Sequence, residues 1–310
     1  MIKPGVFSHL SPIRKLILLS LIAFSGLLIF TALGSLLALL AIEDFFALLS
    51  QQTDLENIRV VNFLRYIQII SQVGLFIIPP LLFAWLDRGS IVSYFRLNKN
   101  PGYRVFVLSS MMVFVALPFI HWTAEMNEAV RFPEWLSGLE KWMHNSEESA
   151  RQITDAFLNT PTLKIFLLNL IMIAVLPAIG EELLFRGVVQ RLLNEWVKNI
   201  HVAVIFTAVL FSALHLQFYG FLPRTILGIL FGYMFVITRT IWVPVLMHFL
   251  NNAAAVIAAY LFRNDLLKTD YHDVGQISNP LWIAGSVLIL LLLVSGVSRI
   301  MRLRDEENNY

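Results

Sequence analysis

Cysteine is absent from this chain of 310 residues. The protein therefore contains no disulfide, no thiolate ligand for a metal and no cysteine nucleophile. Charged residues are also scarce, at 14% of the chain, whereas soluble globular proteins carry about 25%. The 23 basic and 21 acidic residues nearly balance, so the chain lacks the basic surplus that binds nucleic acid. Any chemistry in this protein must use oxygen and imidazole groups.

Apolar residues, by contrast, make up 57% of the sequence, and the mean hydropathy is +0.71. A membrane-spanning helix needs about 20 mostly apolar residues. Eight runs of about this length separate the charge clusters, at about 16–42, 64–86, 104–121, 163–185, 201–219, 223–238, 241–262 and 280–299. We therefore predict an all-α fold, a polytopic membrane helical bundle with about eight transmembrane helices.

The chain divides into three segments. Residues 1–162 contain the first three spans and a polar stretch, residues 163–255 contain the polar clusters described below, and residues 256–310 contain the last span and a tail. Within the polar stretch 122–162, Trp and Leu side chains recur at helical intervals, as Trp135, Leu139 and Trp142. This spacing predicts an amphipathic helix at the outer membrane surface, although a solvated loop with a short helix fits the same residues.

The distribution of basic residues predicts the orientation of the bundle, because Lys and Arg are retained on the cytoplasmic side. With the N-terminus inside, 14 of the 23 basic residues lie on the cytoplasmic side and the other 9 lie outside. We therefore expect an integral, multi-pass protein of the cell inner or plasma membrane with both termini cytoplasmic.

Polar residues interrupt three of the predicted spans. Ionisable groups at membrane depth are costly and are usually functional. The fourth span carries Glu181, Glu182 and Arg186, the fifth carries Phe211 and His215, and the seventh carries His248 and Asn252. Glu182 and Arg186 are four residues apart with the acid first, which is the favourable order for a pair on one helix face. Glu181 has no such partner, so we expect it to point into a cavity.

Helix geometry allows these clusters to meet. Glu181 and His215 lie at similar distances from the turn near Asn199 and differ in height by only about 3 Å, so they can face each other. His248 and Asn252 share one helix face and can direct N–H donors at a single point.

Prolines and glycines add to this pattern. Pro177 and Pro244 each precede a cluster by four residues, where a helix loses a hydrogen bond and can kink. Gly228 and Gly232 form a small-xxx-small pair, which predicts close packing between helices.

In this order and spacing the clusters resemble the CPBP family of intramembrane proteases. That family includes the CAAX prenyl endopeptidases of the Ras-converting type and the bacterial Abi and bacteriocin-processing relatives. Its pattern is Glu-Glu-xxx-Arg, then Phe-xxx-His, then His-xxx-Asn on separate membrane helices, and residues 163–255 contain all three motifs. The resemblance implies proteolysis inside a membrane cavity, with Glu181, His215, His248 and Asn252 as catalytic residues and Glu182, Arg186 and Phe211 in supporting positions.

Two mechanisms fit these residues. In the one that we prefer, Glu181 and His215 hold a water molecule and remove its proton, His248 and Asn252 stabilise the oxyanion, and no cofactor is required. In the other, Glu181, His215 and His248 bind Zn²⁺, as the family's common description as metalloproteases implies. The sequence has no His-Glu-xx-His signature, and Asn252 suits an oxyanion donor better than a zinc ligand.

The expected substrate is a membrane-associated protein or peptide, cleaved near its C-terminus or in a membrane-proximal segment from a cavity open towards the cytoplasm. Nothing in the sequence indicates that this substrate is prenylated. A non-catalytic membrane protein of the immunity or scaffold type, which uses the same residues for helix packing, is the alternative. A transporter with Glu181 as a proton carrier would be expected to contain inverted repeats, and none is visible.

Overall fold

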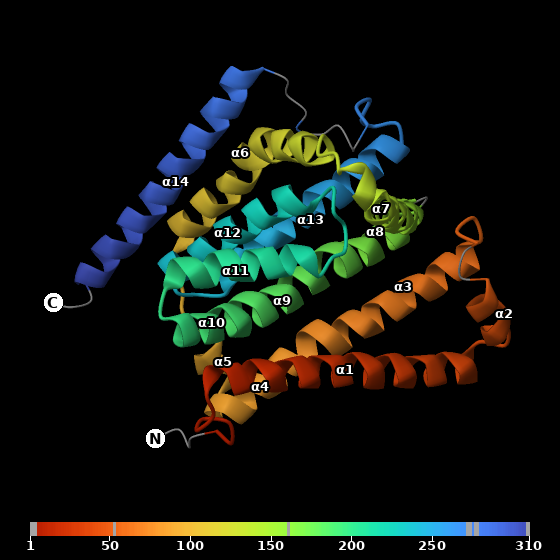
Figure 1. Ribbon diagram of the computed structural model, residues 1–310, viewed down its shortest axis with the longest axis horizontal. Helices are drawn as coiled ribbons and strands as arrows, with labels where there is room; N and C mark the ends of the chain where they lie inside the picture. The colour runs from red at the N-terminus through yellow and green to blue at the C-terminus, as the bar shows by residue number, and fades with distance from the viewer. Residues whose placement is uncertain (1–4, 52–53, 160–161, 271–274, 276–278, 308–310) are drawn as a thin grey trace.

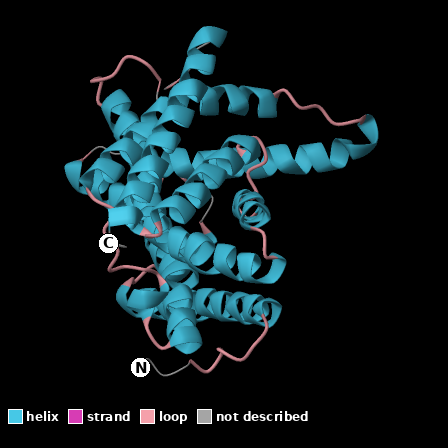
Figure 2. Cartoon of the chain, turned by 90° about the vertical axis from the view of Figure 1, so that its left-hand side faces the viewer, coloured by secondary structure: helices cyan, strands magenta, loops and turns pink. Residues whose placement is uncertain are grey.

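The computed structural model describes residues 5–51, 54–159, 162–270, 275 and 279–307. Helices are the only regular elements in this part of the chain (Figures 1 and 2). Seven helical segments are long and apolar enough to cross a membrane, namely Pro12–Ala41, Ile58–Arg88, Tyr103–Glu128, Leu163–Val197, Phe221–Thr238, Trp242–Arg263 and Pro280–Glu307. The predicted fold class, an all-α polytopic membrane bundle, is confirmed.

In the described part of the chain, ten elements precede residue 170. They are α1 (Pro12–Ala41), α2 (Phe45–Ser50), α3 (Ile58–Gln72), the π-helical η1 (Val73–Ile77), α4 (Ile78–Arg88), α5 (Ile91–Tyr94), α6 (Tyr103–Glu128), the 3₁₀ turn η2 (Glu134–Leu136), α7 (Ser137–Leu158) and α8 (Leu163–Asn169). The second half continues with the π-helical η3 (Leu170–Val175), α9 (Leu176–Glu182), the π-helical η4 (Leu183–Val189), α10 (Gln190–Val197), α11 (Ile200–Ala213), α12 (Phe221–Thr238), α13 (Trp242–Arg263) and α14 (Pro280–Glu307).

The fifth predicted span is shorter in the structure than the sequence indicates. α11 has 14 residues and ends at Ala213, whereas the apolar run extends to residue 219. At about 1.5 Å per residue it is roughly 21 Å long, less than the roughly 30 Å of a hydrocarbon core. The chain then turns through Leu216, whose φ of 53° is left-handed. His215 therefore lies in a turn instead of on the helix.

The two prolines have different outcomes. Pro177 lies at the start of α9, and π-helical turns flank this helix on both sides, so the fourth span is irregular where a kink was expected. Pro244 lies in the first turn of α13, where its missing N–H would have no partner within the helix. Pro244 therefore begins α13 without removing a hydrogen bond from the helix interior.

Polar contacts identify two ends of the bundle. At the terminal end, which contains residues 5–15, 86–102, 239–241 and 299–307, α14 meets the preceding turns. There Arg239 pairs with Asp305 at 3.1 Å, and Arg304 donates to the Asn100 carbonyl at 2.7 Å. This end faces the viewer in Figure 2.

At the opposite end, here called the α7 end, α7 and the turn 214–220 lie together (Figure 1). The backbone N–H of Tyr219 donates to Glu147 of α7 at 3.2 Å. The α7 end is therefore covered by a helix, whereas α14 and turns make up the terminal end.

The amphipathic helix expected in the stretch 122–162 is confirmed as α7, although Trp135 lies in the 3₁₀ turn before it. Trp135, Leu139 and Trp142 are all exposed. Trp142 also packs against Phe218, with ring centroids 5.2 Å apart. Part of this aromatic surface therefore holds the turn 214–220 against α7.

The absence of cysteine allows a clean test of orientation, because one introduced cysteine is then the only thiol. Nothing lies within 4 Å of the position that a Cβ would take at Gly138 in α7, and Asn98 is exposed at the terminal end. With cytoplasmic termini, a membrane-impermeant maleimide should label Gly138→Cys in intact cells, but Asn98→Cys only after permeabilisation. The reverse labelling pattern would contradict the orientation inferred from the basic residues.

Candidate active site

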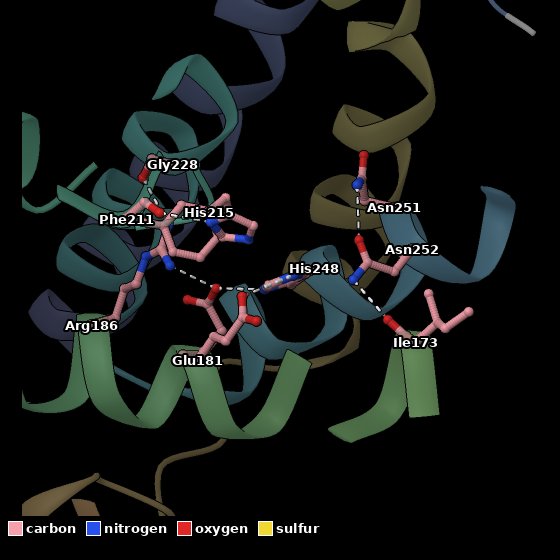
Figure 3. Close-up of polar contacts among 10 residues, drawn as sticks. Ile173, Glu181, Arg186, Phe211, His215, Gly228, His248, Asn251 and Asn252 are labelled. Atoms are coloured by element: carbon pink, nitrogen blue, oxygen red, sulfur yellow. Dashed lines mark hydrogen bonds and ion pairs between the residues drawn. The ribbon is translucent and has the colours of Figure 1, made fainter. Parts of the chain in front are cut away.

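The backbone of the fourth span is irregular around the two glutamates. Pro177 has no N–H to donate to the carbonyl of Ile173, four residues earlier. That carbonyl accepts a hydrogen bond from Asn252 Nδ2 of α13 at 3.0 Å, and Asn251 Nδ2 donates to Asn252 Oδ1 at 3.1 Å (Figure 3). One amide N–H of Asn252 is therefore used to join α13 to the fourth span.

Glu182 is the centre of a buried polar network. Its Oε1 accepts hydrogen bonds from Arg186 Nη1 and from His248 Nδ1, both at 2.9 Å. Arg186 also donates from Nη2 to the Gly228 carbonyl of α12 at 3.2 Å. The side chains of Glu182 and Arg186 are 0% exposed, so the predicted pair is present and is fully removed from solvent. This network joins the fourth span, α12 and α13.

The glycine pair of α12 contributes more than close packing. A Cβ on Gly228 would lie 3.0 Å from Ala208 Cβ, and a Cβ on Gly232 would lie 2.9 Å from both Val204 Cγ1 and Gln190 Oε1. The carbonyls of these glycines accept from Arg186 and Gln190, each at 3.2 Å. The small residues thus bring α12 close enough for its backbone to satisfy two buried polar side chains.

Aromatic rings enclose the network. The guanidinium of Arg186 lies 4.8 Å from the ring centroid of Phe211, within cation–π range. The same ring meets His215 edge-on at 4.9 Å, and Phe231 lies 5.7 Å from His248. Phe211 therefore separates the buried ion pair from the histidine in the turn.

Glu181 differs from Glu182 in its surroundings. Its side chain lines a cavity and makes no hydrogen bond to any other described residue. The nearest partner is His248, whose Nε2 lies 3.8 Å from Glu181 Oε2, beyond hydrogen-bonding distance. The expected division between a paired and an unpaired glutamate is therefore present in the structure.

Each of the two histidines is oriented by a hydrogen bond from its Nδ1 atom. His215 Nδ1 lies 2.8 Å from the Phe211 carbonyl, and His248 Nδ1 lies 2.9 Å from the Glu182 carboxylate. Because a carbonyl and a carboxylate only accept, each Nδ1 carries the proton. His215 Nε2 has no partner among the described residues, and His248 Nε2 faces Glu181.

A cavity of about 680 Å³ brings most of the predicted residues together. Side chains from α3, α7, η3, α9, α12, α13 and the segment 211–220 line it. The motif residues among them are Glu181, Phe211, His215, His248 and Asn252. Glu182 and Arg186 do not reach the cavity and lie behind it.

The position of this cavity is incompatible with two of the expectations from the sequence when they are taken together. Its exposed lining side chains include Ile153 and Thr154 of α7 and His215 of the adjoining turn, so the cavity is open at the α7 end. A cavity open towards the cytoplasm and cytoplasmic termini cannot both hold, because the termini approach the opposite end (Figure 1). α7, in which the sequence revealed no chemistry, forms part of the cavity wall.

The possible zinc ligands Glu181, His215 and His248 share the cavity but do not form a ligand set in this arrangement. Throughout the described residues, no group of three His, Cys, Asp or Glu side chains lies close enough to hold one metal ion. The buried carboxylate behind His248 is nevertheless an arrangement that also orients metal-bound histidines.

The cavity also contains polar residues that the motifs do not identify. Gln68 and Gln72 come from α3, Thr154 comes from α7, and Arg224 comes from the first turn of α12. Arg224 is one of the nine basic residues that the sequence places outside, and an ionisable residue within an apolar helix is itself a signal of function. The helices of the N-terminal segment thus complete a site whose motifs all lie after residue 163.

The part of the chain that contains most of this site is similar to known proteins. Residues 163–254 match the family model described as Type II CAAX prenyl endopeptidase Rce1-like. The resemblance inferred from the three motifs is confirmed for this Rce1-like segment. It ends just after Asn252 and contains every predicted site residue.

Two proteins of Bacillus subtilis (strain 168) are similar to this chain. "Uncharacterized protein YpbD" is 29% identical over 109 residues, which cover 34% of this chain and 51% of YpbD. "Putative membrane peptidase YdiL" is 28% identical over 110 residues, which cover 36% of this chain and 42% of YdiL. The chain thus matches about half the length of these relatives. No solved structure matches the chain.

The Glu182–Arg186 pair predicts a large effect on stability. We expect Arg186→Met to lower the free energy of unfolding by about 3–5 kcal/mol, because it leaves a buried carboxylate without its cation. Replacing both residues by Met should recover most of this loss. Thermal unfolding in detergent measures both changes, with Arg131→Met as a control at an exposed arginine. An unchanged unfolding temperature for Arg186→Met would contradict the prediction.

Proposed function

We propose that this protein is an intramembrane endopeptidase that hydrolyses a peptide bond of a membrane-associated protein or peptide. The main support is the placement of Glu181, a carboxylate without a hydrogen-bonding partner among the described residues, in a cavity with two oriented imidazoles. The match of residues 163–254 to a peptidase family supports the same activity.

In the proposed mechanism, Glu181 is the general base. A water molecule between Glu181 and the bare Nε2 of His215 would lose a proton to the carboxylate as it attacks the substrate carbonyl carbon. The proton held by Glu181 then passes to the leaving amine nitrogen when the carbon–nitrogen bond breaks. Each proton is therefore accounted for within the cavity.

His248 and Asn252 are assigned to the oxyanion of the tetrahedral intermediate. His248 can donate from Nε2 only when it carries a second proton, and its ring lies between the carboxylates of Glu182 and Glu181. Asn252 keeps one N–H on the Ile173 carbonyl and has a second for the oxyanion. Glu182 and Arg186 act as positioning residues, because they fix the ring of His248.

Substrate access is proposed from the α7 end, where the cavity is open. If the termini are cytoplasmic, this end is extracytoplasmic, and the protein would act on segments presented at the outer face of the inner or plasma membrane. The proposed partners are a membrane-associated protein or peptide and the surrounding lipid bilayer.

Loss of the base should abolish the activity while the fold persists. We expect Glu181→Gln to lower the cleavage rate by about 10²–10⁴-fold, since general-base catalysis supplies about that factor, and His215→Ala to have a similar effect. Mass spectrometry of protein termini should show products that disappear in cells carrying Glu181→Gln but persist with Glu134→Gln, a control at an exposed carboxylate. Terminal peptides that are identical in all cells would contradict hydrolysis.

The scaffold alternative predicts the opposite pattern. A packing change such as Gly232→Leu, which places a side chain against Val204 and Gln190, would then remove the biological effect, whereas Glu181→Gln would retain it. Retention of the effect by Glu181→Gln would favour the scaffold.

Metal dependence separates the two mechanisms. Because the side chains supply a base and oxyanion donors without a metal, we expect the purified protein to keep its cleavage rate within about twofold in the presence of a zinc chelator. Elemental analysis of the same preparation supplies the zinc content. Loss of cleavage that added Zn²⁺ restores would contradict the glutamate mechanism and support a metal-bound water.

A further inference from the structure

Arg224 is a charged cavity residue that the proposed hydrolysis does not use. It lies in the first turn of α12, within a helix apolar enough to span a membrane, and lines the same cavity as Glu181. It is the only Lys or Arg among the described residues that line this cavity. A cation in such a position is costly unless a counter-charge or water compensates for it.

No carboxylate oxygen among the described residues lies within 4.0 Å of the Arg224 guanidinium. Its hydrogen bonds go to Gln217, with Nη2 donating to Oε1 at 2.7 Å and Nη1 donating to the backbone carbonyl at 3.4 Å. Gln217 is uncharged, so these bonds orient the guanidinium without neutralising it. The carboxylates of Glu147 and Glu181 act on Arg224 only from beyond ion-pairing distance. Arg186, by contrast, has Glu182 as a direct counter-ion at 2.9 Å.

The turn before α12 packs closely against the Arg224 side chain. A Cβ on Gly220 would lie 2.9 Å from Arg224 Nη2 and 3.5 Å from its Cζ. The guanidinium therefore occupies space that any other residue at position 220 would restrict. Gln217 and Gly220 together hold a planar cation at the cavity wall, with N–H donors left over for a ligand.

We propose that Arg224 binds the C-terminal carboxylate of the peptide substrate and so directs cleavage to bonds near the C-terminus. This assignment rests on the proposed peptidase function. A guanidinium pairs with a carboxylate through two parallel hydrogen bonds, which fixes orientation as well as charge. Because Arg224 has no carboxylate in direct contact among the described residues, one carboxylate of a ligand can pair with it.

The rest of the cavity suits a peptide attached to that carboxylate. Gln68, Gln72 and Asn251 supply amide donors and acceptors for backbone groups, and Ile153, Phe157 and Leu227 supply apolar surface for side chains. An extended peptide advances about 3.3–3.6 Å per residue. The distance between the Arg224 and Glu181 side chains would therefore set how many residues lie beyond the cleaved bond.

The test measures binding without turnover. In the full-length Glu181→Gln protein in neutral-lipid vesicles, the probe is a fluorescent, N-palmitoylated alanyl-leucyl-valyl-leucine with a free carboxylate, compared with its C-terminal carboxamide. We expect the acid to bind about tenfold or more tightly, the range expected for a charge-assisted hydrogen bond. Adding Arg224→Gln should reduce this preference to within about twofold, and Arg224→Lys should leave an intermediate preference.

Arg131→Gln is the matched control, because it removes an arginine that is exposed and does not line the cavity. It should keep the full preference for the acid, and thermal unfolding of each variant monitors the fold. Equal binding of acid and amide with Arg224 present, or a preference that survives Arg224→Gln in folded protein, would overturn the proposal. So would loss of the preference in vesicles containing phosphatidylglycerol, which would assign the guanidinium to a lipid phosphate.

The outcome is independent of hydrolysis. If the Glu181→Gln protein prefers the acid but the wild-type protein cleaves nothing, the peptidase function is refuted and the carboxylate site is kept. If the wild-type protein cleaves but the Glu181→Gln protein shows no preference for the acid, the carboxylate site is refuted and the peptidase function is kept.

Discussion

The carboxylate of Glu182 is the contact on which the rest of the site depends. An unpaired charge at this depth would cost several kcal/mol, about 3–5 when one partner of a buried pair is removed, so Arg186 must remain bound to it. His248 binds the same oxygen from α13, and Arg186 continues to a backbone carbonyl of α12. One oxygen atom thereby fixes the relative positions of three spans. Glu181, one residue earlier and about 100° round the helix, is left to face the cavity.

Irregular backbone is the second constraint, and it is tolerated at membrane depth only where protein or a cavity covers it. The π-helical turns η3 and η4 lie on either side of α9, which contains the two glutamates. Pro177, at the start of α9, has no backbone N–H to donate. The carbonyl of Ile173 then needs a donor from outside the helix, which Asn252 supplies. The same bond explains why the motif's asparagine lies close to the motif's glutamates although 70 residues separate them.

Residues that interact at short range within one helix could be predicted from the sequence. The spacing of Glu182 and Arg186 was sufficient to predict their pair, and hydropathy was sufficient to predict the membrane bundle. The end of α11 could not be predicted in this way, because contacts with distant elements, such as Tyr219 with Glu147, hold the turn 214–220. α7 was predicted as a helix from its spacing, but its place in the cavity wall depends on packing against α3, α8 and α13.

Arg224 is unusual in the side of the membrane on which it is expected to lie and in the apolar helix that contains it. Basic residues are disfavoured on the outer side, and with cytoplasmic termini Arg224 is among the minority that lie there. An exposed outer arginine such as Arg131 is solvated at little cost, whereas Arg224 is partly buried in an apolar helix beside a neutral glutamine. Neither orientation nor solubility accounts for a cation in that position. The proposed anionic ligand, entering from the α7 end, would supply the direct ion pair that Arg224 lacks in the described chain, because Glu147 and Glu181 act on it only from beyond ion-pairing distance.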